Sequence, residues 1–196
     1  YGIWACVSPA IVGKANRTTR PNIGCISAAK CMELVLYQGK DKDIYTGRQL
    51  GARTPDPRTF TCIEDVMDAY FAQVKFFVDR MVAIDNIAHV LFPQELPRPF
   101  TSALIDDCIE EGKDCTSFAH NGVTNVQMIG STNAANSIAA IKKLIFDEKT
   151  LTWDELIEAC RNNFEGKEEL RQRLINRAPK FGNDDDYADL ITREVQ

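Results

Sequence analysis

The residue best suited to unusual chemistry is Cys6, which lies in the apolar segment Ile3-Trp-Ala-Cys-Val-Ser-Pro9. A cysteine that acts as an ionic nucleophile needs a lowered thiol pKa, which a helix N-terminus or an adjacent His or Lys supplies. The segment holds neither basic residue, so we expect a neutral S–H group. Such a group suits a small buried core residue, and it equally suits hydrogen-atom transfer, in which the thiol keeps its hydrogen until a radical removes it.

The other cysteines predict reduced thiols and no metal site. There are seven in all, an odd number without a Cys-x-x-Cys pair: Cys6, Cys25, Cys31, Cys62, Cys108, Cys115 and Cys160. Several occupy apolar helical positions, which is typical of buried thiols in a reducing compartment, and the cytoplasm is the expected location. His89 and His120 each lack a second ligand four residues on, so we expect no bound metal ion.

Composition indicates a soluble globular protein of 196 residues with 44% hydrophobic content. No apolar run reaches the roughly 18 residues that a membrane-spanning helix needs, and we expect no membrane partner. Residues 1–60 carry a charge of +5 and the remainder −10, but the basic residues are spread singly, which argues against nucleic acid. One or two early arginines could instead face an anionic small molecule. Because the chain starts without methionine in apolar sequence, we expect it to be cut from a longer protein.

Hydrophobic periodicity and capping signals predict a chain dominated by helices, with short strands. The expected elements are a strand over 1–7, helices over 23–38, 63–89, 101–111, 133–148, 152–163, 167–176 and 187–196, and a strand within 115–130. Thr61 with Glu64, and Thr152 with Glu155, are the expected capping boxes. In the strand within 115–130, Gln127 is expected to project to the same side as Ile129.

The first segment, Tyr1-Gly-Ile-x-x-Cys-Val-x-Pro9, resembles the cysteine loop of glycyl radical enzymes, the family of pyruvate formate-lyase and the radical diol dehydratases. Further segments resemble the family in the same order along the chain. They are Ala29-Lys-Cys-Met-Glu-Leu-Val-Leu36, Thr46-Gly-Arg-Gln49, Pro55-Asp-Pro57, Ala103-Leu-Ile-Asp-Asp-Cys108, Asn136-Ser-Ile-Ala-Ala-Ile-Lys-Lys143, Asn163-Phe-Glu-Gly166, Glu169-Leu-Arg171 and Ala178-Pro-Lys-Phe-Gly-Asn-Asp-Asp-Asp-Tyr187. Together they cover nearly the whole chain.

This resemblance implies an α/β fold, with the chain as a helix-rich fragment of the family's ten-stranded α/β barrel. Residues 1–196 would be a central to C-terminal part of the barrel, without its N-terminal half and its glycine-radical domain. By the same resemblance Cys6 becomes a thiyl radical that takes a hydrogen atom from the substrate and returns one to the product. On this basis we expect the chain alone to be inactive.

The resemblance also implies the partners. A radical S-adenosylmethionine activating enzyme would install the glycyl radical on a part of the protein outside this chain, so no cofactor binds the chain directly. The remainder of the barrel, a second copy in a homodimer and a small-molecule substrate complete the expected partners.

Two departures from the family's pattern bear on the reaction. Diol dehydratases carry a glutamate two residues after the cysteine, where this chain has Ser8, and an aspartate fourteen residues after it, where this chain has Arg20. A hydroxyl cannot replace the carboxylate base, which disfavours diol dehydration. The pattern looks closer to the succinate synthases that add hydrocarbons to fumarate, in which an arginine near this place holds a carboxylate. Arg17 competes with Arg20 for that role, and either could be a loop arginine without a ligand.

Gln127 occupies the family's Gln-x-x-Gly stretch and is a candidate substrate contact beside Ser8 and Arg20, although a strand glutamine is more often bonded to backbone. The sequence therefore predicts a thiyl-radical enzyme for a carboxylate-bearing substrate, with fumarate addition ahead of decarboxylation or carbon–carbon cleavage. The alternatives are a diol or glycerol dehydratase-like lyase, and a split, non-catalytic helical module.

Overall fold

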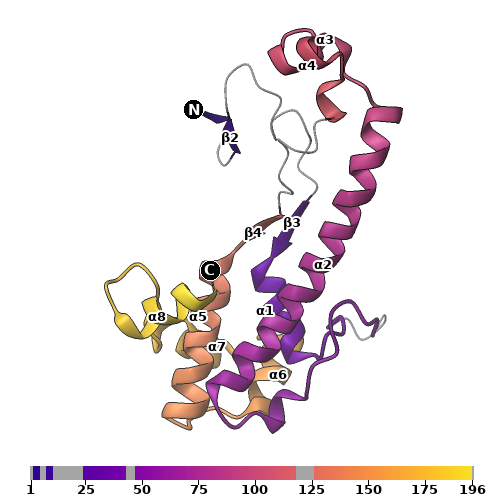
Figure 1. Cartoon of the computed structure of the whole chain (residues 1–196). Coiled ribbons are helices and arrows are strands. Elements are labelled where there is room, and N and C mark those ends of the chain that lie inside the picture. The colour runs from indigo at the N-terminus through magenta and orange to yellow at the C-terminus, as the bar shows by residue number, and fades with distance from the viewer. Residues whose placement is uncertain (1, 5–7, 11–23, 43–46, 118–125, 196) are drawn as a thin grey trace. The chain divides into compact units, whose positions relative to one another are not determined.

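The computed structural model describes residues 2–4, 8–10, 24–42, 47–117 and 126–195, with the backbone alone at 2–4, 8–10 and 126 (Figure 1). The chain divides into two compact units. Unit 1 comprises Tyr1–Cys25 and Val78–Gln127, and unit 2 comprises Ile26–Phe77 and Met128–Gln196. The resemblance to the family predicts a helix-rich chain, and both units contain helices.

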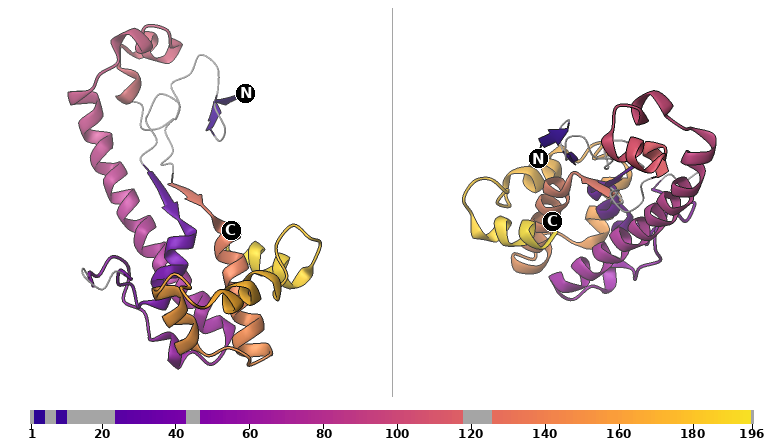
Figure 2. Two further views of the ribbon diagram at one scale, coloured as in Figure 1. Left: turned by 180° about the vertical axis from the view of Figure 1, so that it is seen from behind. Right: turned by 45° about the horizontal axis from the view of Figure 1, so that its top comes forward.

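Unit 2 is a group of helices around a shared apolar core. Its elements are α1 (Ala28–Leu36), η2 (Pro57–Thr59), the first part of α2 (Ile63–Glu95), α5 (Ser131–Ile141), the π-helical turn η4 (Lys142–Asp147), α6 (Trp153–Arg161), α7 (Glu168–Asn176) and α8 (Asp186–Val195). Helix α5 packs beside α1 and α8, as Figure 1 and its rear view in Figure 2 both show. Fully buried side chains from these helices form the core, among them Leu34, Val35, Val66, Tyr70, Ile138 and Leu144.

Local capping signals start two of these helices, one as predicted and one not. The capping box at the start of α6 is confirmed: the Glu155 amide donates to Thr152 Oγ1, and the Thr152 amide donates to Glu155 Oε2 at 2.9 Å. The predicted box of Thr61 with Glu64 is wrong by one residue. Asp65 Oδ2 instead accepts from the Thr61 amide at 2.7 Å, because the helix begins at Ile63 and places Asp65 where it can reach back.

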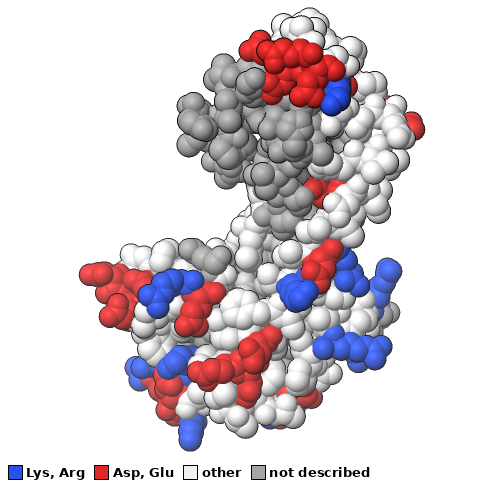
Figure 3. Space-filling view, in the orientation of Figure 1, with Lys and Arg blue, Asp and Glu red and all other residues white. Residues whose placement is uncertain are grey.

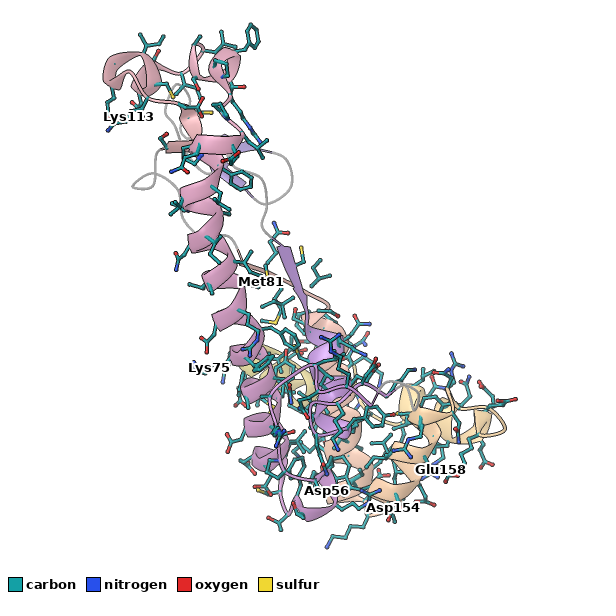
Figure 4. The ribbon with its side chains drawn as sticks, turned by 90° about the vertical axis from the view of Figure 1, so that its right-hand side faces the viewer. Asp56, Lys75, Met81, Lys113, Asp154 and Glu158 are labelled. Atoms are coloured by element: carbon teal, nitrogen blue, oxygen red, sulfur yellow. The ribbon has the colours of Figure 1, made fainter. Side chains whose placement is uncertain are left out.

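An exposed ion-pair cluster ties η2 to α6. The Arg58 guanidinium lies 3.0 Å from Asp56 and 2.6 Å from Asp154, and these two carboxylates lie close together in Figure 4. The hydrogen bonds from Asp154 and then Asp56 raise the pKa of Arg58 above its usual value. Exposure keeps the energetic value of such a pair small, so its role is to orient the segment before α2.

The segment between α1 and η2 is held by a buried glutamine from α2. The Gln73 side chain is fully buried and donates to the Ala52 carbonyl at 2.8 Å, while its Oε1 accepts from the Ala52 amide at 2.9 Å. The side-chain amide thus replaces a neighbouring strand as hydrogen-bond partner of Ala52. Next to it, the amides of Leu50 and Gly51 both donate to the Gly39 carbonyl at 2.9 Å.

Replacing Gln73 with leucine will destabilise the protein by about 2 to 4 kcal/mol, because Ala52 loses both partners for its backbone amide and carbonyl. Thermal unfolding of the complete protein measures the change. The matched control is Gln172→Leu, since Gln172 is exposed on α7 and its side chain bonds to Glu168 and Asn176 of its own helix. Equal melting temperatures for the two variants would contradict this account of the loop.

Unit 1 holds short strands, the second part of α2 and a small helical cap. Its elements are β1 (Gly2–Trp4), β2 (Ser8–Ala10), α3 (Pro99–Ser102), α4 (Asp106–Glu111) and η3 (Cys115–Ser117), and strands β3 (Gly24–Ser27) and β4 (Val126–Ile129) reach into it. β3 and β4 form a two-stranded sheet. Asp114 connects short helical segments of this unit. Its carboxylate accepts hydrogen bonds from the Arg98 amide at 2.7 Å, from Ser102 Oγ at 2.8 Å and from Thr116 Oγ1 at 2.6 Å.

Several predicted elements need correction in this unit. The single strand over 1–7 is instead the hairpin β1–β2, and the start of the helix over 23–38 is β3. The helix over 101–111 is broken into α3 and α4, and α4 ends as expected at Gly112, which has φ 61°. α2 continues past His89 to Glu95, and its buried apolar side chains, such as Val66, Met67 and Tyr70, belong to unit 2. Large apolar side chains are exposed farther along: Val82, Ile84, Ile87, Val90, Leu91, Leu96, Phe100, Leu104 and Ile109.

Charge is distributed differently over the two units. On the face in Figure 3, acidic side chains gather over α3 and α4, whereas basic and acidic side chains are mixed over unit 2. No helix among the residues with assigned structure is long and apolar enough to cross a membrane. The six cysteines that the structure describes are free thiols, of which Cys31, Cys108 and Cys115 are buried.

Candidate active site

In the sequence, the predicted thiyl residue falls between strands β1 and β2. The strands pair antiparallel with Gly2 opposite Ala10, Ile3 opposite Pro9 and Trp4 opposite Ser8. Pro9 has no N–H to give to a ladder, which suits a short two-stranded ribbon rather than a central strand. Cys6 itself belongs to residues 5–7 and lies outside the described residues, while Ser8 is described in its backbone as the first residue of β2.

Arg20 and its competitor Arg17 also lie outside the described residues, in the stretch 11–23. Of the four predicted site residues, the structure therefore describes a side chain only for Gln127. The grouping of Cys6, Ser8, Arg20 and Gln127 in one site stays a prediction.

Gln127 is half-buried in β4, and its two amide atoms have different surroundings. Its Oε1 accepts a hydrogen bond from the thiol of Cys25, with 3.5 Å between sulfur and oxygen. Its Nε2 is buried and has no hydrogen-bond partner among the described residues. A buried amide nitrogen carries two donors, and leaving them unpaired costs about 1 to 3 kcal/mol. An unpaired donor of this kind is a point at which a ligand oxygen could bind.

Strand β3 brings Cys25 to this position through a close approach at its first residue. A Cβ atom at Gly24 would lie 2.6 Å from Cε of Met81, a residue of α2 that is labelled in Figure 4. A side chain at this position would therefore require the flexible end of the Met81 side chain to shift. This contact could not be predicted from the sequence, because nothing in the spacing of Gly24 and Met81 links them.

Unit 2 contains a separate cavity of about 630 Å³ that includes none of the predicted site residues. Its lining includes Tyr37, Lys42, Cys160, Asn163 and Lys180. Burial raises the pKa of the Cys160 thiol to about 11, and burial followed by the nearby Cys160 raises the pKa of Tyr37 to about 12. Both groups are therefore neutral at physiological pH, and the cavity lacks an activated nucleophile among them.

The described residues offer no metal centre: no group of three or more His, Cys, Asp or Glu side chains is placed to hold an ion. The thiols whose pKa values are shifted are shifted upward, as in Cys31, where burial raises the pKa to about 11. Neutral thiols of this kind suit hydrogen-atom chemistry better than ionic catalysis.

Sequence reasoning missed Cys25 as a partner of Gln127. The two residues are 102 positions apart, so no local pattern could join them. The available signal was weak: the sequence placed Gln127 in a strand but Cys25 in a helix over 23–38, so it predicted no pairing between them.

Comparison with known proteins places the whole chain in one family. A family model described as pyruvate formate lyase-like matches residues 1–196. The chain is 33% identical to trans-4-hydroxy-L-proline dehydratase of Clostridioides difficile, over 99% of this chain and 24% of that protein. It is 38% identical to isethionate sulfite-lyase of Nitratidesulfovibrio vulgaris, over 100% of this chain and 23% of that protein.

A solved structure that concerns 1,2-propanediol dehydration in Roseburia inulinivorans matches all of this chain and 25% of its own, with a TM-score of 0.83 and 31% identity. The chain thus spans about a quarter of the length of the relatives that it matches. The helix-rich architecture is that of part of their barrel. This chain belongs to the pyruvate formate lyase-like family, the glycyl radical enzymes.

Proposed function

We propose that this chain forms the part of a glycyl radical lyase that carries the hydrogen-abstracting cysteine, and that the enzyme removes a leaving group from a small anionic substrate. The supporting observation is the match over the full chain, at 33% and 38% identity, to a dehydratase and a sulfite-lyase. Both names describe loss of a group from carbon, one as water and the other as sulfite.

The anionic substrate class rests on two features. Hydroxyproline carries a carboxylate and isethionate a sulfonate, so both named relatives act on compounds that carry an anionic group. In this chain Arg20 stands fourteen residues after Cys6, and a guanidinium can hold either anionic group with two parallel hydrogen bonds.

In the proposed reaction each of the four predicted site residues has one role. A glycyl radical elsewhere in the protein supplies the unpaired electron by taking the hydrogen atom of the Cys6 thiol. The Cys6 sulfur then takes a hydrogen atom from a substrate carbon, the leaving group departs from the adjacent carbon, and Cys6 returns a hydrogen atom to the product. Ser8 and Gln127 donate hydrogen bonds that orient the substrate, and Arg20 pairs with its anion.

Fumarate addition, which the sequence favoured, receives less support than the lyase reaction. The Ser8 and Arg20 departures motivated it, but the dehydratase and the sulfite-lyase, which are 33% and 38% identical to this chain over the matched residues, are named for elimination reactions. The chain has Ser8 where the diol dehydratases carry a glutamate base, so the proposed reaction proceeds without that base. We infer that a leaving group such as sulfite accepts the proton of the hydroxyl on the radical carbon as it departs, so that a carbonyl and bisulfite form and the need for a separate base is smaller.

The direct test uses the complete native protein, activated anaerobically by its radical S-adenosylmethionine enzyme. It is incubated separately with trans-4-hydroxy-L-proline, isethionate, (2S)-3-sulfopropanediol, glycerol, 4-hydroxyphenylacetate, and fumarate with toluene, and the products are analysed by mass spectrometry. Elimination from a carboxylate or sulfonate is the expected result. Conversion of only fumarate with toluene would contradict the lyase assignment, and absence of any glycyl radical signal after activation would favour the non-catalytic module.

Replacing Arg20 with alanine will raise KM for the converted anion by about 30-fold or more, because a lost charge-assisted pair costs about 2 kcal/mol or more. The melting temperature of the complete enzyme should change little. Arg17→Ala is the matched control, since it removes the same group three residues earlier. A larger KM effect for Arg17→Ala would move the anion contact to Arg17, and no effect in either variant would remove it from this segment.

A further inference from the structure

The hydrogen bond between Cys25 and Gln127 links strands β3 and β4. It also makes the two ends of the glutamine amide, Oε1 and Nε2, differ in their hydrogen bonding. The thiol donates to Oε1 at 3.5 Å, and Nε2 is left buried without an acceptor among the described residues. An S–H group is a weak donor and a poor acceptor, so it favours the oxygen end of an amide over the nitrogen end. Rotation of the amide by 180° would bring two donor groups together.

This contact also limits the freedom of a long side chain. A free glutamine loses about 1.5 to 2 kcal/mol of rotamer entropy when a ligand fixes it. A side chain that is already fixed in the free enzyme avoids most of that cost on binding, and its donors are then aimed before the substrate arrives. Nε2 is the end that offers donors to a ligand, since Oε1 can only accept and already accepts from the thiol.

We propose that Cys25 is a positioning residue of the active site: its thiol holds the Gln127 amide so that Nε2 donates to an oxygen of the substrate. The inference rests on the proposed function for the identity of that substrate and adds to it a residue outside the cysteine loop. Cys25 itself does not touch the reacting atoms. Its effect passes through Gln127, and this gives a test that a purely structural role would fail.

The first arm of the test needs no activity. Crystal structures of the complete, unactivated enzyme are compared for the wild type, Cys25→Ala and Cys25→Ser. The serine hydroxyl replaces the thiol as donor, so Gln127 should keep its position in Cys25→Ser and shift in Cys25→Ala. An unchanged Gln127 side chain in Cys25→Ala overturns the inference whatever the enzyme's reaction is.

The second arm measures kinetics on the panel compound that the wild-type enzyme converts. Gln127→Ala should lower kcat/KM about tenfold and Cys25→Ala about fivefold, mainly through KM, while Cys25→Ser stays within about twofold of the wild type. Cys25→Ala should add nothing in the Gln127→Ala background, because it acts through the amide. Multiplying effects in the double variant, or wild-type kinetics for Cys25→Ala beside an impaired Gln127→Ala, overturn the inference alone.

The experiments distinguish failure of the substrate contact by Gln127 from failure of its positioning by Cys25. Wild-type kinetics for Gln127→Ala would remove Gln127 from the proposed substrate site, while the crystallographic arm would still decide whether Cys25 orients it. Cys62→Ala is the matched control for loss of a thiol, since Cys62 is half-buried at the start of α2 in unit 2. It should leave both the Gln127 position and the kinetics unchanged.

Discussion

Replacement of Cys6 by alanine in the complete, activated enzyme lowers turnover by at least about 10³-fold, equivalent to about 4 kcal/mol of activation free energy. The reason is chemical: alanine has no S–H bond, and no neighbouring side chain in Ile3-Trp-Ala-Cys-Val-Ser-Pro9 can exchange a hydrogen atom in its place. The glycyl radical is formed elsewhere in the protein, so its signal in electron paramagnetic resonance should remain. Turnover and radical content are measured on the same activated sample.

Two further variants make this result specific to the sulfur of Cys6. Cys6→Ser keeps the size and polarity of the side chain but offers an O–H bond, and it should be as inactive as Cys6→Ala. Cys62→Ala removes a thiol from unit 2 and should keep full turnover. Retained turnover in Cys6→Ala, with a normal glycyl signal, would end the assignment of Cys6 as the thiyl residue.

Gly39→Ala is the substitution with the largest expected effect on local stability, about 3 kcal/mol or more. Gly39 has φ 79°, and a Cβ atom there would collide with the carbonyl oxygen of Ala52. Its amide also donates to the Leu34 carbonyl at 2.8 Å and closes α1. The backbone must move to admit the methyl group, and the two hydrogen bonds that the Gly39 carbonyl accepts must then open.

Hydrogen exchange measured by mass spectrometry on the complete enzyme reports this opening. The Leu50 and Gly51 amides, which both donate to Gly39, should exchange about 100-fold faster or more in Gly39→Ala. Gly166→Ala is the matched control in the same unit, because Gly166 also has positive φ, 68°, but a Cβ atom there meets nothing within 4 Å. Similar exchange of the Leu50 and Gly51 amides in the two variants would contradict the account, in which the contact of the added Cβ atom with Ala52 opens these hydrogen bonds.

Elements with strong local signals could be predicted from the sequence. The helix after Thr152 starts with the expected capping box, and the helix from Glu168 to Asn176 has the expected end. Short strands could not be predicted well, because three or four residues carry too little periodic signal. Strand β3, four residues long, was therefore assigned to the start of the following helix. The same applies to β2, where Pro9 indicated a loop although a two-stranded ribbon tolerates it.

The candidate site could be predicted only where the resemblance supplied the residues. Cys6 came from a segment that matches a family motif, whereas Ser8 and Arg20 came from positions where the chain departs from the family's pattern. Cys25 came from the structure alone, because its contact with Gln127 depends on the pairing of segments 102 positions apart. Non-local contacts of this kind arise from packing of the whole chain and leave no trace in local sequence spacing.

The central claim is that the Cys6 sulfur lies beside the substrate in a site closed to water, and the most direct measurement is a crystal structure of the complete, unactivated enzyme with the converted compound bound. The account predicts the Cys6 sulfur about 3 to 4 Å from the substrate carbon that loses its hydrogen, with Gln127 Nε2 donating to a substrate oxygen. A Cys6 sulfur that faces bulk solvent, or a substrate bound in a cavity without it, would contradict the account.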